Sequence, residues 1–358
     1  MNPSVPTSAD TLRSALGGLL DGLPPKQATA AVERLIANYR GQTPTNAPVL
    51  RDRSDVAAYA AYRMPATFEA VRAALDAFRA AAPDWAPASH VDVGGGTGAA
   101  AWAVDATWEG PRTTTVLDWA EPALTLGREL AGSSSSEALR GAEWRRAVIG
   151  AGLELPDADL VTVSYVLGEL TPQARAAVVT EAARAAATVV IIEPGTPDGY
   201  LRVREARDLL IAAGLRVAAP CPHDGTCPVV VGEDWCHFAA RVSRSSLHRQ
   251  VKGGSLAYED EKFSYVAATR VPAVPATARI TRRPQIRKGL VLLDLCGGPA
   301  ASGAAADAAS DTTVGAAAEA AAPGPGLSRA TVTKRHGDLY KAARDADWGQ
   351  EWPPVQPG

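Results

Sequence analysis

The sequence predicts an α/β protein whose centre is a doubly wound parallel sheet. Short apolar runs indicate buried strands, amphipathic stretches between them indicate helices, and a glycine-rich loop directly follows the first apolar run. The 358 residues are enough for one large domain or two ordinary ones, and the formal net charge is only −3. Because alanine is abundant along the whole chain, periodicity is a better guide than residue preference.

A helical segment is expected first. Between about residues 9 and 82, apolar side chains recur at three- and four-residue intervals, for example at Leu12, Leu16 and Leu19. We therefore assign residues 1–85 to a helical N-terminal segment.

Buried strands follow, each of them a short apolar run. The expected strands span 90–93, 114–117, 160–163 and 189–192. Helical stretches separate them, and this alternation of strand and helix predicts parallel pairing. The doubly wound domain is assigned to residues 86–270.

A smaller, mostly β part is expected beyond Gly214. Segments such as 235–238 and 262–266 alternate apolar and polar residues between prolines, which predicts antiparallel strands and loops. We assign residues 271–358 to a basic C-terminal extension. Within it, residues 297–328 hold almost no large apolar side chain, so a disordered insert is predicted there.

Charge and apolar runs limit the partners. Residues 237–296 hold 11 Lys/Arg and 4 Asp/Glu, a balance of +7, so the rest of the chain carries −10 (−3 − 7), and this asymmetry suits an anionic partner. No apolar run is long enough to span a membrane, and the start lacks a secretory-signal pattern. The sequence predicts a cytoplasmic protein without a membrane segment, in which cysteines are expected to be free thiols or metal ligands.

The loop after the first strand, residues 92–98, reads DVGGGTG and precedes a helix of small residues. Glycines at this spacing, Gly94, Gly96 and Gly98, let the backbone turn tightly and lie close to a ligand, and a helix N-terminus attracts negative charge. Asp118, at the end of the second strand, supplies the acid that nucleotide sites carry about twenty residues later. A dinucleotide and S-adenosylmethionine both fit this pattern.

Asp92 favours S-adenosylmethionine, because dinucleotide-binding proteins usually carry an apolar residue at this point of the first strand. There it resembles the D-x-G-x-G-x-G loop of S-adenosylmethionine-dependent methyltransferases. In those enzymes this acid orients the loop and the cationic ligand, and the second-strand acid holds the ribose hydroxyls. A glycine turn without a ligand is the remaining alternative.

The acceptor side of the site has fewer signals. Residues 164–169 lack the Asn/Asp-Pro-Pro-aromatic motif of amino-group methylases of nucleic acids. Cys221 lies in a Pro-Cys-Pro sequence, but it follows the wrong strand to be a cytosine methylase nucleophile. Glu193 either lines the pocket or is an exposed acid at a strand end. We assign no catalytic residue.

The cysteines predict a metal site. Intervals of five, eight and fifty-nine residues separate Cys221, Cys227, Cys236 and Cys296. Structural zinc sites usually use C-x2-C pairs, which are missing here. Long loops rich in proline and glycine suit a larger group, so an iron–sulfur cluster is weakly favoured over zinc. His223 and His237 are alternative ligands, unless they bond to nearby backbone or face RNA.

Several segments together resemble the methyltransferase-like proteins associated with the small ribosomal subunit, a family best known from mitochondrial ribosome assembly. The resembling segments are 59–67, 92–98, 165–170, 193–197, 220–265, 333–340 and 348–349. The most specific of them is 220–265, which contains DWCHF and EDEKFSY. The chain departs from the mitochondrial members by its insert after Cys296.

This resemblance implies a methyltransferase-like domain at 86–270 that includes three of the cysteines. It implies a 4Fe-4S cluster bound by Cys221, Cys227, Cys236 and Cys296. The residues expected to bind S-adenosylmethionine are Asp92, Gly94, Gly96, Gly98, Asp118 and Tyr165.

The resemblance also implies contact with the small ribosomal subunit and its RNA. A basic run before the last cysteine would contact phosphates, unless it is simply a solvated face; it comprises Arg279, Arg282, Arg283, Arg287 and Lys288. The protein is then either an RNA methyltransferase or a non-catalytic RNA-binding assembly factor with a structural metal site. Off the ribosome it is expected to be a monomer.

Overall fold

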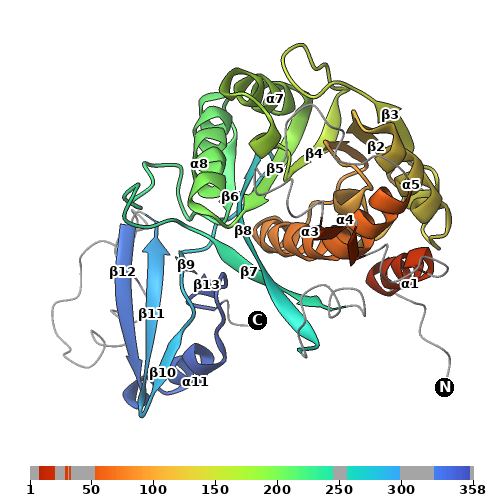
Figure 1. Ribbon diagram of the computed structural model, residues 1–358. Coiled ribbons are helices and arrows are strands. Elements are labelled where there is room, and N and C mark those ends of the chain that lie inside the picture. Colours follow the sequence, from red (N-terminus) through yellow and green to blue (C-terminus); the bar gives the residue numbers. More distant parts are fainter. Residues whose placement is uncertain are drawn as a thin grey trace.

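The computed structural model describes residues 8–20, 29–30, 32–33, 53–244, 256–298 and 326–354 (Figure 1). Two sheets organise them: an eight-stranded mixed sheet covered by helices, and a five-stranded antiparallel sheet beside it. Among these residues, no helix has the length and apolar character needed to cross a membrane.

The large sheet has the strand order β3-β2-β1-β4-β5-β8-β6, and β7 pairs with β8. Its strands are β1 (Ser89–Val93), β2 (Thr113–Asp118), β3 (Glu143–Arg146), β4 (Ala158–Ser164), β5 (Ala186–Pro194), β6 (Arg216–Ala219), β7 (Phe238–Ser243) and β8 (Tyr258–Thr269). The first five pair in parallel, whereas β8 runs antiparallel to β5, β6 and β7. The prediction of a doubly wound, methyltransferase-type sheet is confirmed.

Helices cover both faces of this sheet and bury two separate apolar cores. One face carries α1 (Ser8–Leu20), α3 (Arg53–Ala81), α4 (Ala99–Thr107), α5 (Glu121–Gly132) and α6 (Glu137–Arg140); the other carries α7 (Pro172–Ala185) and α8 (Pro197–Ala212). The hydroxyls of Thr171 and Thr196 cap the N-termini of α7 and α8, and a proline follows each cap. Both helices therefore start at fixed points beside the carboxyl ends of β4 and β5.

The four predicted buried strands lie within β1, β2, β4 and β5, whose apolar runs are almost fully buried. The sequence did not reveal β3, because its residues are exposed except for Trp144. The predicted strand at 235–238 is wrong for its first three residues, since β7 begins at Phe238; the one at 262–266 lies within β8.

The small sheet has the order β10-β11-β9-β13, with β12 on the other side of β11. It comprises β9 (Ala278–Ile280), β10 (Gln285–Arg287), β11 (Leu290–Gly297), β12 (Gly326–Thr333) and β13 (Glu351–Trp352). Two short helices, η2 (Lys334–His336) and α11 (Asp338–Asp345), lie between β12 and β13 in the chain. Its own core includes Leu293, Leu295, Val332 and Trp352. The predicted mostly β C-terminal part is thus present.

Two sequence predictions reach beyond the described residues. Of the predicted insert at 297–328, Gly297 ends β11 and residues 326–328 begin β12, so these positions are strand; residues 299–325 lie outside the described part. Of the helical N-terminal segment, α1 and α3 are described, and residues 1–7, 21–28, 31 and 34–52 are not.

Candidate functional site

The glycine-rich loop turns through three left-handed glycines. Gly94, Gly96 and Gly98 have φ angles of 68°, 55° and 83°, a region that favours glycine. A Cβ atom on Gly94 would lie 2.6 Å from Val166, and one on Gly98 would lie 2.5 Å from Trp144. At Gly96 the nearest atom would be 3.8 Å away. The backbone at Gly96 therefore borders open space, as the approach of a ligand requires.

Asp118 holds this loop in shape. Its Oδ2 accepts the Gly96 N–H at 2.9 Å, and its Oδ1 accepts the Ala120 N–H at 2.8 Å. Burial raises the pKa of Asp118, and these backbone hydrogen bonds oppose the rise. Each carboxylate oxygen can accept a second hydrogen bond, so Asp118 also has capacity for the ribose hydroxyls predicted from the sequence.

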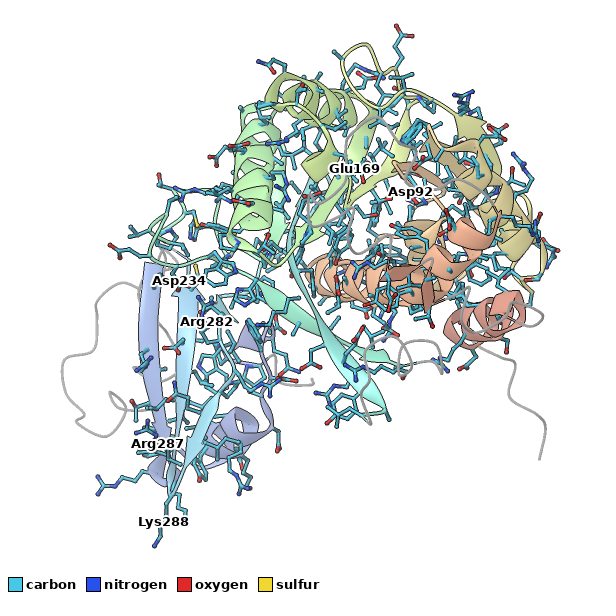
Figure 2. All side chains as sticks on the ribbon, viewed as in Figure 1. Asp92, Glu169, Asp234, Arg282, Arg287 and Lys288 are labelled. Atoms are coloured by element: carbon cyan, nitrogen blue, oxygen red, sulfur yellow. The ribbon has the colours of Figure 1, made fainter. Side chains whose placement is uncertain are left out.

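Asp92 lies in β1, directly before the glycine loop, and is labelled in Figure 2. It is fully buried, and its Oδ1 accepts a hydrogen bond from the Thr162 hydroxyl at 2.9 Å, while its Oδ2 has no partner. A Cβ atom on Gly95 would lie 2.5 Å from this Oδ2. Burial raises the pKa of Asp92 to about 7. The position fits the predicted role in orienting the loop.

Tyr165 belongs to a polar network next to the loop. Among the described residues, it is the one non-glycine residue with a positive φ, 59°, a strained backbone state often found at functional sites. Its hydroxyl donates to Glu261 at 3.1 Å, and Glu261 forms an ion pair with Arg63 at 3.0 Å. We call these three side chains the Tyr165 network. Their polar groups bond to one another.

Glu193 matches neither of its two sequence-based interpretations. It is fully buried; its Oε2 forms an ion pair with Arg202 at 2.6 Å, and its Oε1 accepts the Leu167 N–H at 3.0 Å. Its role is to brace the turn after β4. Glu169, by contrast, is an exposed residue, although partial burial of its carboxyl and the nearby Asp118 and Glu193 carboxylates raise its pKa.

Sequence reasoning missed two apolar residues beside Asp118. Trp119 and Val148 are both exposed and line a shallow cavity with Arg146 and Ala147. An exposed tryptophan directly after a strand-end acid is a signal that the sequence does carry. These side chains offer an apolar surface close to the glycine loop.

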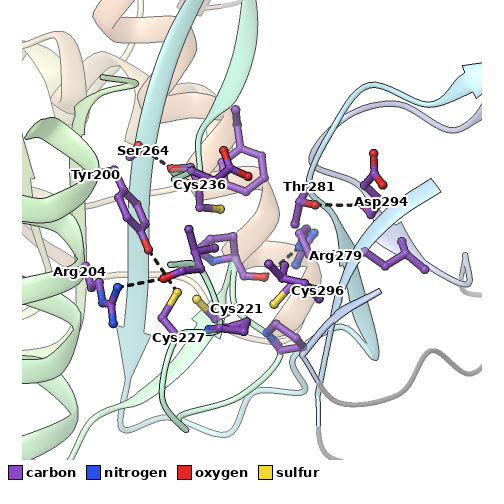
Figure 3. Close-up of a pocket in the computed structure, with 18 of the residues that line it drawn as sticks. Tyr200, Arg204, Cys221, Cys227, Cys236, Ser264, Arg279, Thr281, Asp294 and Cys296 are labelled. Carbon is purple, nitrogen blue, oxygen red and sulfur yellow. Dashed lines mark hydrogen bonds between the residues drawn. The ribbon is translucent and has the colours of Figure 1, made fainter. Parts of the chain in front are cut away.

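The four cysteines line one cavity of about 510 Å³ (Figure 3). Cys221 and Cys227 lie in the loop after β6, and Cys236 lies just before β7. Cys296 comes from β11 of the small sheet, at the residue paired with Arg279 of β9. The cavity therefore joins the two sheets.

The thiols lie close enough to affect one another. Burial is the main cause that raises the pKa of Cys221, Cys236 and Cys296, the last to about 12, and neighbouring cysteines add to each rise. A bound metal would instead lower the pKa of these thiols, because coordination deprotonates them. Four sulfurs are a donor set that suits zinc or an iron–sulfur cluster. In the described part of the chain, no three His, Cys, Asp or Glu side chains are grouped closely enough to hold a single ion.

The two histidines near the cysteines differ. His223 lines the cavity, and its Nε2 lies 4.0 Å from the Cys296 sulfur. His237 is buried, stacks on Trp235 with ring centres 5.1 Å apart, and meets Trp348 edge-on at 4.9 Å. His237 is thus part of an aromatic cluster, and His223 is the histidine placed near the sulfurs.

The predicted basic run splits into separate environments. Arg279 is only 6% exposed; its Nε donates to the Pro220 carbonyl at 3.1 Å and another guanidinium N–H donates to the Gly349 carbonyl at 3.0 Å. The prediction that Arg279 contacts phosphate is therefore wrong, because β pairing turns its side chain inward. Arg282 is paired with Asp234 near the cavity (Figure 2).

The remaining members of the run are exposed. Arg283 lies 3.5 Å from Asp260, and Arg287 and Lys288 project from the turn between β10 and β11 (Figure 2). Strand β12 brings two further cations to the same end, since Lys334 donates its N–H to the Gly289 carbonyl at 3.2 Å. We call this end the basic tip; it comprises Arg287, Lys288, Lys334 and Arg335, all exposed.

Comparison with protein families gives a match to the family described as mitochondrial small ribosomal subunit Rsm22, over residues 53–304 and 319–353. The human mitochondrial ribosome assembly protein METTL17 is 27% identical over 317 residues, which cover 84% of this chain and 62% of METTL17. The mitochondrial Rsm22-cox11 tandem protein 2 of Schizosaccharomyces pombe is 22% identical over 207 residues, 46% of this chain and 24% of that protein. The chain thus spans less than two thirds of these relatives.

Solved structures also resemble the chain. An O-methyltransferase family protein from Burkholderia thailandensis matches with 13% identity and a TM-score of 0.43, over 68% of this chain and 70% of its own. A SAM-dependent methyltransferase from Aquifex aeolicus matches with 18% identity and a TM-score of 0.39, over 62% of this chain and all of its own.

Proposed function

Because this chain belongs to the mitochondrial small ribosomal subunit Rsm22 family, we propose that it binds S-adenosylmethionine and a 4Fe-4S cluster and contacts small-subunit ribosomal RNA in ribosome assembly or translation. One observation carries the proposal: the cysteine cavity joins the methyltransferase-like sheet to the sheet that bears the basic tip. A cytoplasmic location and a monomeric state stay predictions; the names of the relatives place those proteins in mitochondria.

The donor would lie against the glycine loop. Three features support this: the open space at Gly96, the spare acceptor capacity of Asp118, and the exposed apolar surface of Trp119 and Val148, which would cover the adenine base. Bound S-adenosylmethionine supplies an electrophilic methyl group. The loop, fixed by Asp118 and supported by Asp92, would set the direction in which that group points.

The cluster would be held by Cys221, Cys227, Cys236 and Cys296. Their side chains line one cavity of about 510 Å³, and four cysteine sulfurs are the usual ligand set of such a cluster. A bound cluster supplies a one-electron redox centre. The cysteines themselves would cross-link the two sheets through it.

Ribosomal RNA would meet the basic tip. Its four cations project together from one end of the small sheet, and phosphate contacts of this kind add up without depending on base sequence. Arg283 lies in the loop between β9 and β10 and its side chain is 67% exposed, so we keep it in the proposed surface. Arg279 and Arg282 are excluded from this surface, because their guanidinium groups already form hydrogen bonds to the Pro220 carbonyl and to Asp234.

Two functions are compatible with this arrangement. An RNA methyltransferase is favoured by the glycine loop, whose backbone at Gly96 leaves space for a methyl donor. A non-catalytic assembly factor is favoured by the Tyr165 network, whose polar groups satisfy one another. In the second case donor and cluster would be structural or sensing ligands.

The metal is tested on the purified chain. Protein isolated without oxygen should be brown, with a broad visible absorbance and about four irons per chain. A colourless protein holding one zinc would reject the cluster.

Catalysis is tested in cells that lack the gene. Ribosomal RNA from these cells should miss a methyl group that the wild-type protein restores. Gly96→Asp protein places a side chain in the space next to Asp118, so it should not take the donor. If that variant restores subunit assembly completely, the enzyme proposal fails and the assembly-factor proposal stands.

A further inference from the structure

One face of α8 is turned toward the cysteine cavity. Tyr200, Val203, Arg204 and Arg207 all line it, and their spacing of three, four and seven residues places them on one side of a helix. Figure 3 shows Tyr200 and Arg204 on this face. An outward helix face would carry polar side chains toward solvent. Here two arginines and a tyrosine hydroxyl face the cavity instead.

Tyr200 contacts a cysteine directly. Its hydroxyl oxygen lies 3.3 Å from the Cys227 sulfur (Figure 3). A free thiol and a tyrosine can each be the donor, but a thiolate bound to metal has no proton. With Cys227 as a ligand, the hydrogen bond therefore runs from Tyr200 to sulfur.

Arg207 fixes the loop that carries the first two cysteines. It is only 4% exposed, and one of its nitrogens donates to the carbonyls of His223 and Gly225 at 2.8 and 2.7 Å. Its Nε is buried without a hydrogen-bond partner. Arg204 adds a third bond, to the Val229 carbonyl at 3.2 Å. The loop after β6 that carries these cysteines is thus fastened to α8 by its carbonyls. The buried Arg207 guanidinium, which also pairs with the exposed Asp208 at 3.2 Å, borders the cavity.

We propose that Tyr200 and Arg207 set the reduction potential of the cluster, with Arg207 also positioning the ligand loop. This inference rests on the proposed 4Fe-4S cluster. One-electron reduction adds a negative charge to the cluster without making a bond or moving a proton. A hydrogen bond to sulfur and a buried cation both stabilise that added charge, and hydrogen bonds and net charge are the means by which proteins tune such clusters. Both side chains therefore raise the potential.

The test measures the midpoint potential of the full-length protein, purified without oxygen and titrated with dithionite in the presence of mediators. Tyr200→Phe keeps the ring and removes the hydroxyl. It should keep its iron and become harder to reduce, with up to a tenfold change in the ratio of reduced to oxidised cluster at a fixed potential, about 59 mV for one electron. Tyr258→Phe, at an exposed tyrosine of β8, is the matched control and should leave the potential unchanged.

Arg207→Gln gives a second, independent comparison. It removes the charge but keeps an amide that can donate to a loop carbonyl, so the potential should again fall. If Tyr200→Phe protein keeps its cluster and has the wild-type potential, the inference is wrong while the proposed cluster stands. Wild-type protein that contains zinc overturns both.

Discussion

Arg279 links the fourth cysteine to the first. It lies opposite Cys296 in the pairing of β9 with β11, and its Nε donates to the carbonyl of Pro220, the residue before Cys221, at 3.1 Å. A second bond, to the Gly349 carbonyl, anchors the C-terminal segment at the same point. The two sheets are thus fastened beside the cavity by a protein side chain.

Loss of this link should destabilise the chain. Arg279→Met keeps much of the apolar volume but leaves two carbonyls without a donor, and hydrogen bonds from a charged group contribute about 1.5–3 kcal/mol each. We expect the free energy of unfolding, measured by urea denaturation, to fall by roughly 3 kcal/mol. Arg283→Met, at a side chain that is 67% exposed, should change it by less than about 0.5 kcal/mol. Equal effects of the two changes would show that the Arg279 bonds do not matter.

Asp118→Ala should weaken S-adenosylmethionine binding. The change removes the acceptor for the Gly96 and Ala120 N–H groups and for the ribose, so a loss of roughly 10- to 100-fold is expected. Calorimetry measures the affinity. Asp157→Ala, at a side chain that is 89% exposed, is the matched control and should bind normally. Tight binding of NADH instead of S-adenosylmethionine would reverse the assignment of the donor.

Asp92 should make stability depend on pH. Its pKa is about 7 in the folded chain and near 3.8 when unfolded, so between these values the folded state holds the extra proton. Stability from this group is therefore present below pH 3.8 and lost as pH rises to about 7, by up to about 4 kcal/mol.

The measurement compares wild type with Asp92→Asn, whose amide oxygen can still accept from Thr162. The difference cancels other titrating groups, such as the buried His90. Relative to wild type, the variant should gain stability between about pH 4 and pH 7 and no more above that. A difference that stays constant with pH would mean that Asp92 is ionised throughout.

Local motifs were readable from the sequence, whereas long-range pairing was not. The glycine loop and the cysteines are short signatures whose chemistry depends on residue type and spacing, so the sequence alone predicts both. Arg279 and Arg287 look alike in the sequence. Only the pairing of β9 with β11 turns Arg279 into the protein, and only the turn after β10 leaves Arg287 in solvent.

The same reason explains the residues that were missed. Lys334 reaches the basic tip through the pairing of β12 with β11, across the segment 299–325. The sequence did not indicate that one face of α8 contacts the cysteines, because Tyr200 and Arg207 line a cavity that is formed by a later loop. Charge alone predicted a surface, but not which cations would form it.

The basic tip should carry part of the salt dependence of RNA binding. Replacing both Lys288 and Lys334 by alanine should weaken binding to a small-subunit RNA fragment and reduce the slope of log affinity against log salt by about 2, one for each lost phosphate contact. Fluorescence anisotropy at several salt concentrations gives this slope. The double change Arg329→Ala and Lys341→Ala is the control.

This control removes the same charge from the same part of the chain, but its cations are already paired with Asp294 and Asp338. It should alter the slope less. If both double variants change it equally, binding depends on net charge and the tip has no special role.

Cys296 should matter more for RNA binding than for donor binding. It is the one cysteine in the small sheet, so Cys296→Ser would remove the cluster's hold on the sheet that carries the basic tip. The glycine loop follows β1 and Asp118 ends β2, whereas the other cysteines lie next to β6 and β7, on the far side of the large sheet. The hydrogen bond between the Gly96 N–H and Asp118 therefore does not depend on the cluster. We expect a loss of iron and of RNA affinity, with S-adenosylmethionine affinity close to wild type. Thr331→Ala, at an exposed residue of the same β11–β12 pair that does not line the cysteine cavity, is the control and should keep iron, RNA binding and donor binding. An equal loss of RNA and donor binding in Cys296→Ser protein would mean that the cluster supports the whole fold and not the attachment of the small sheet.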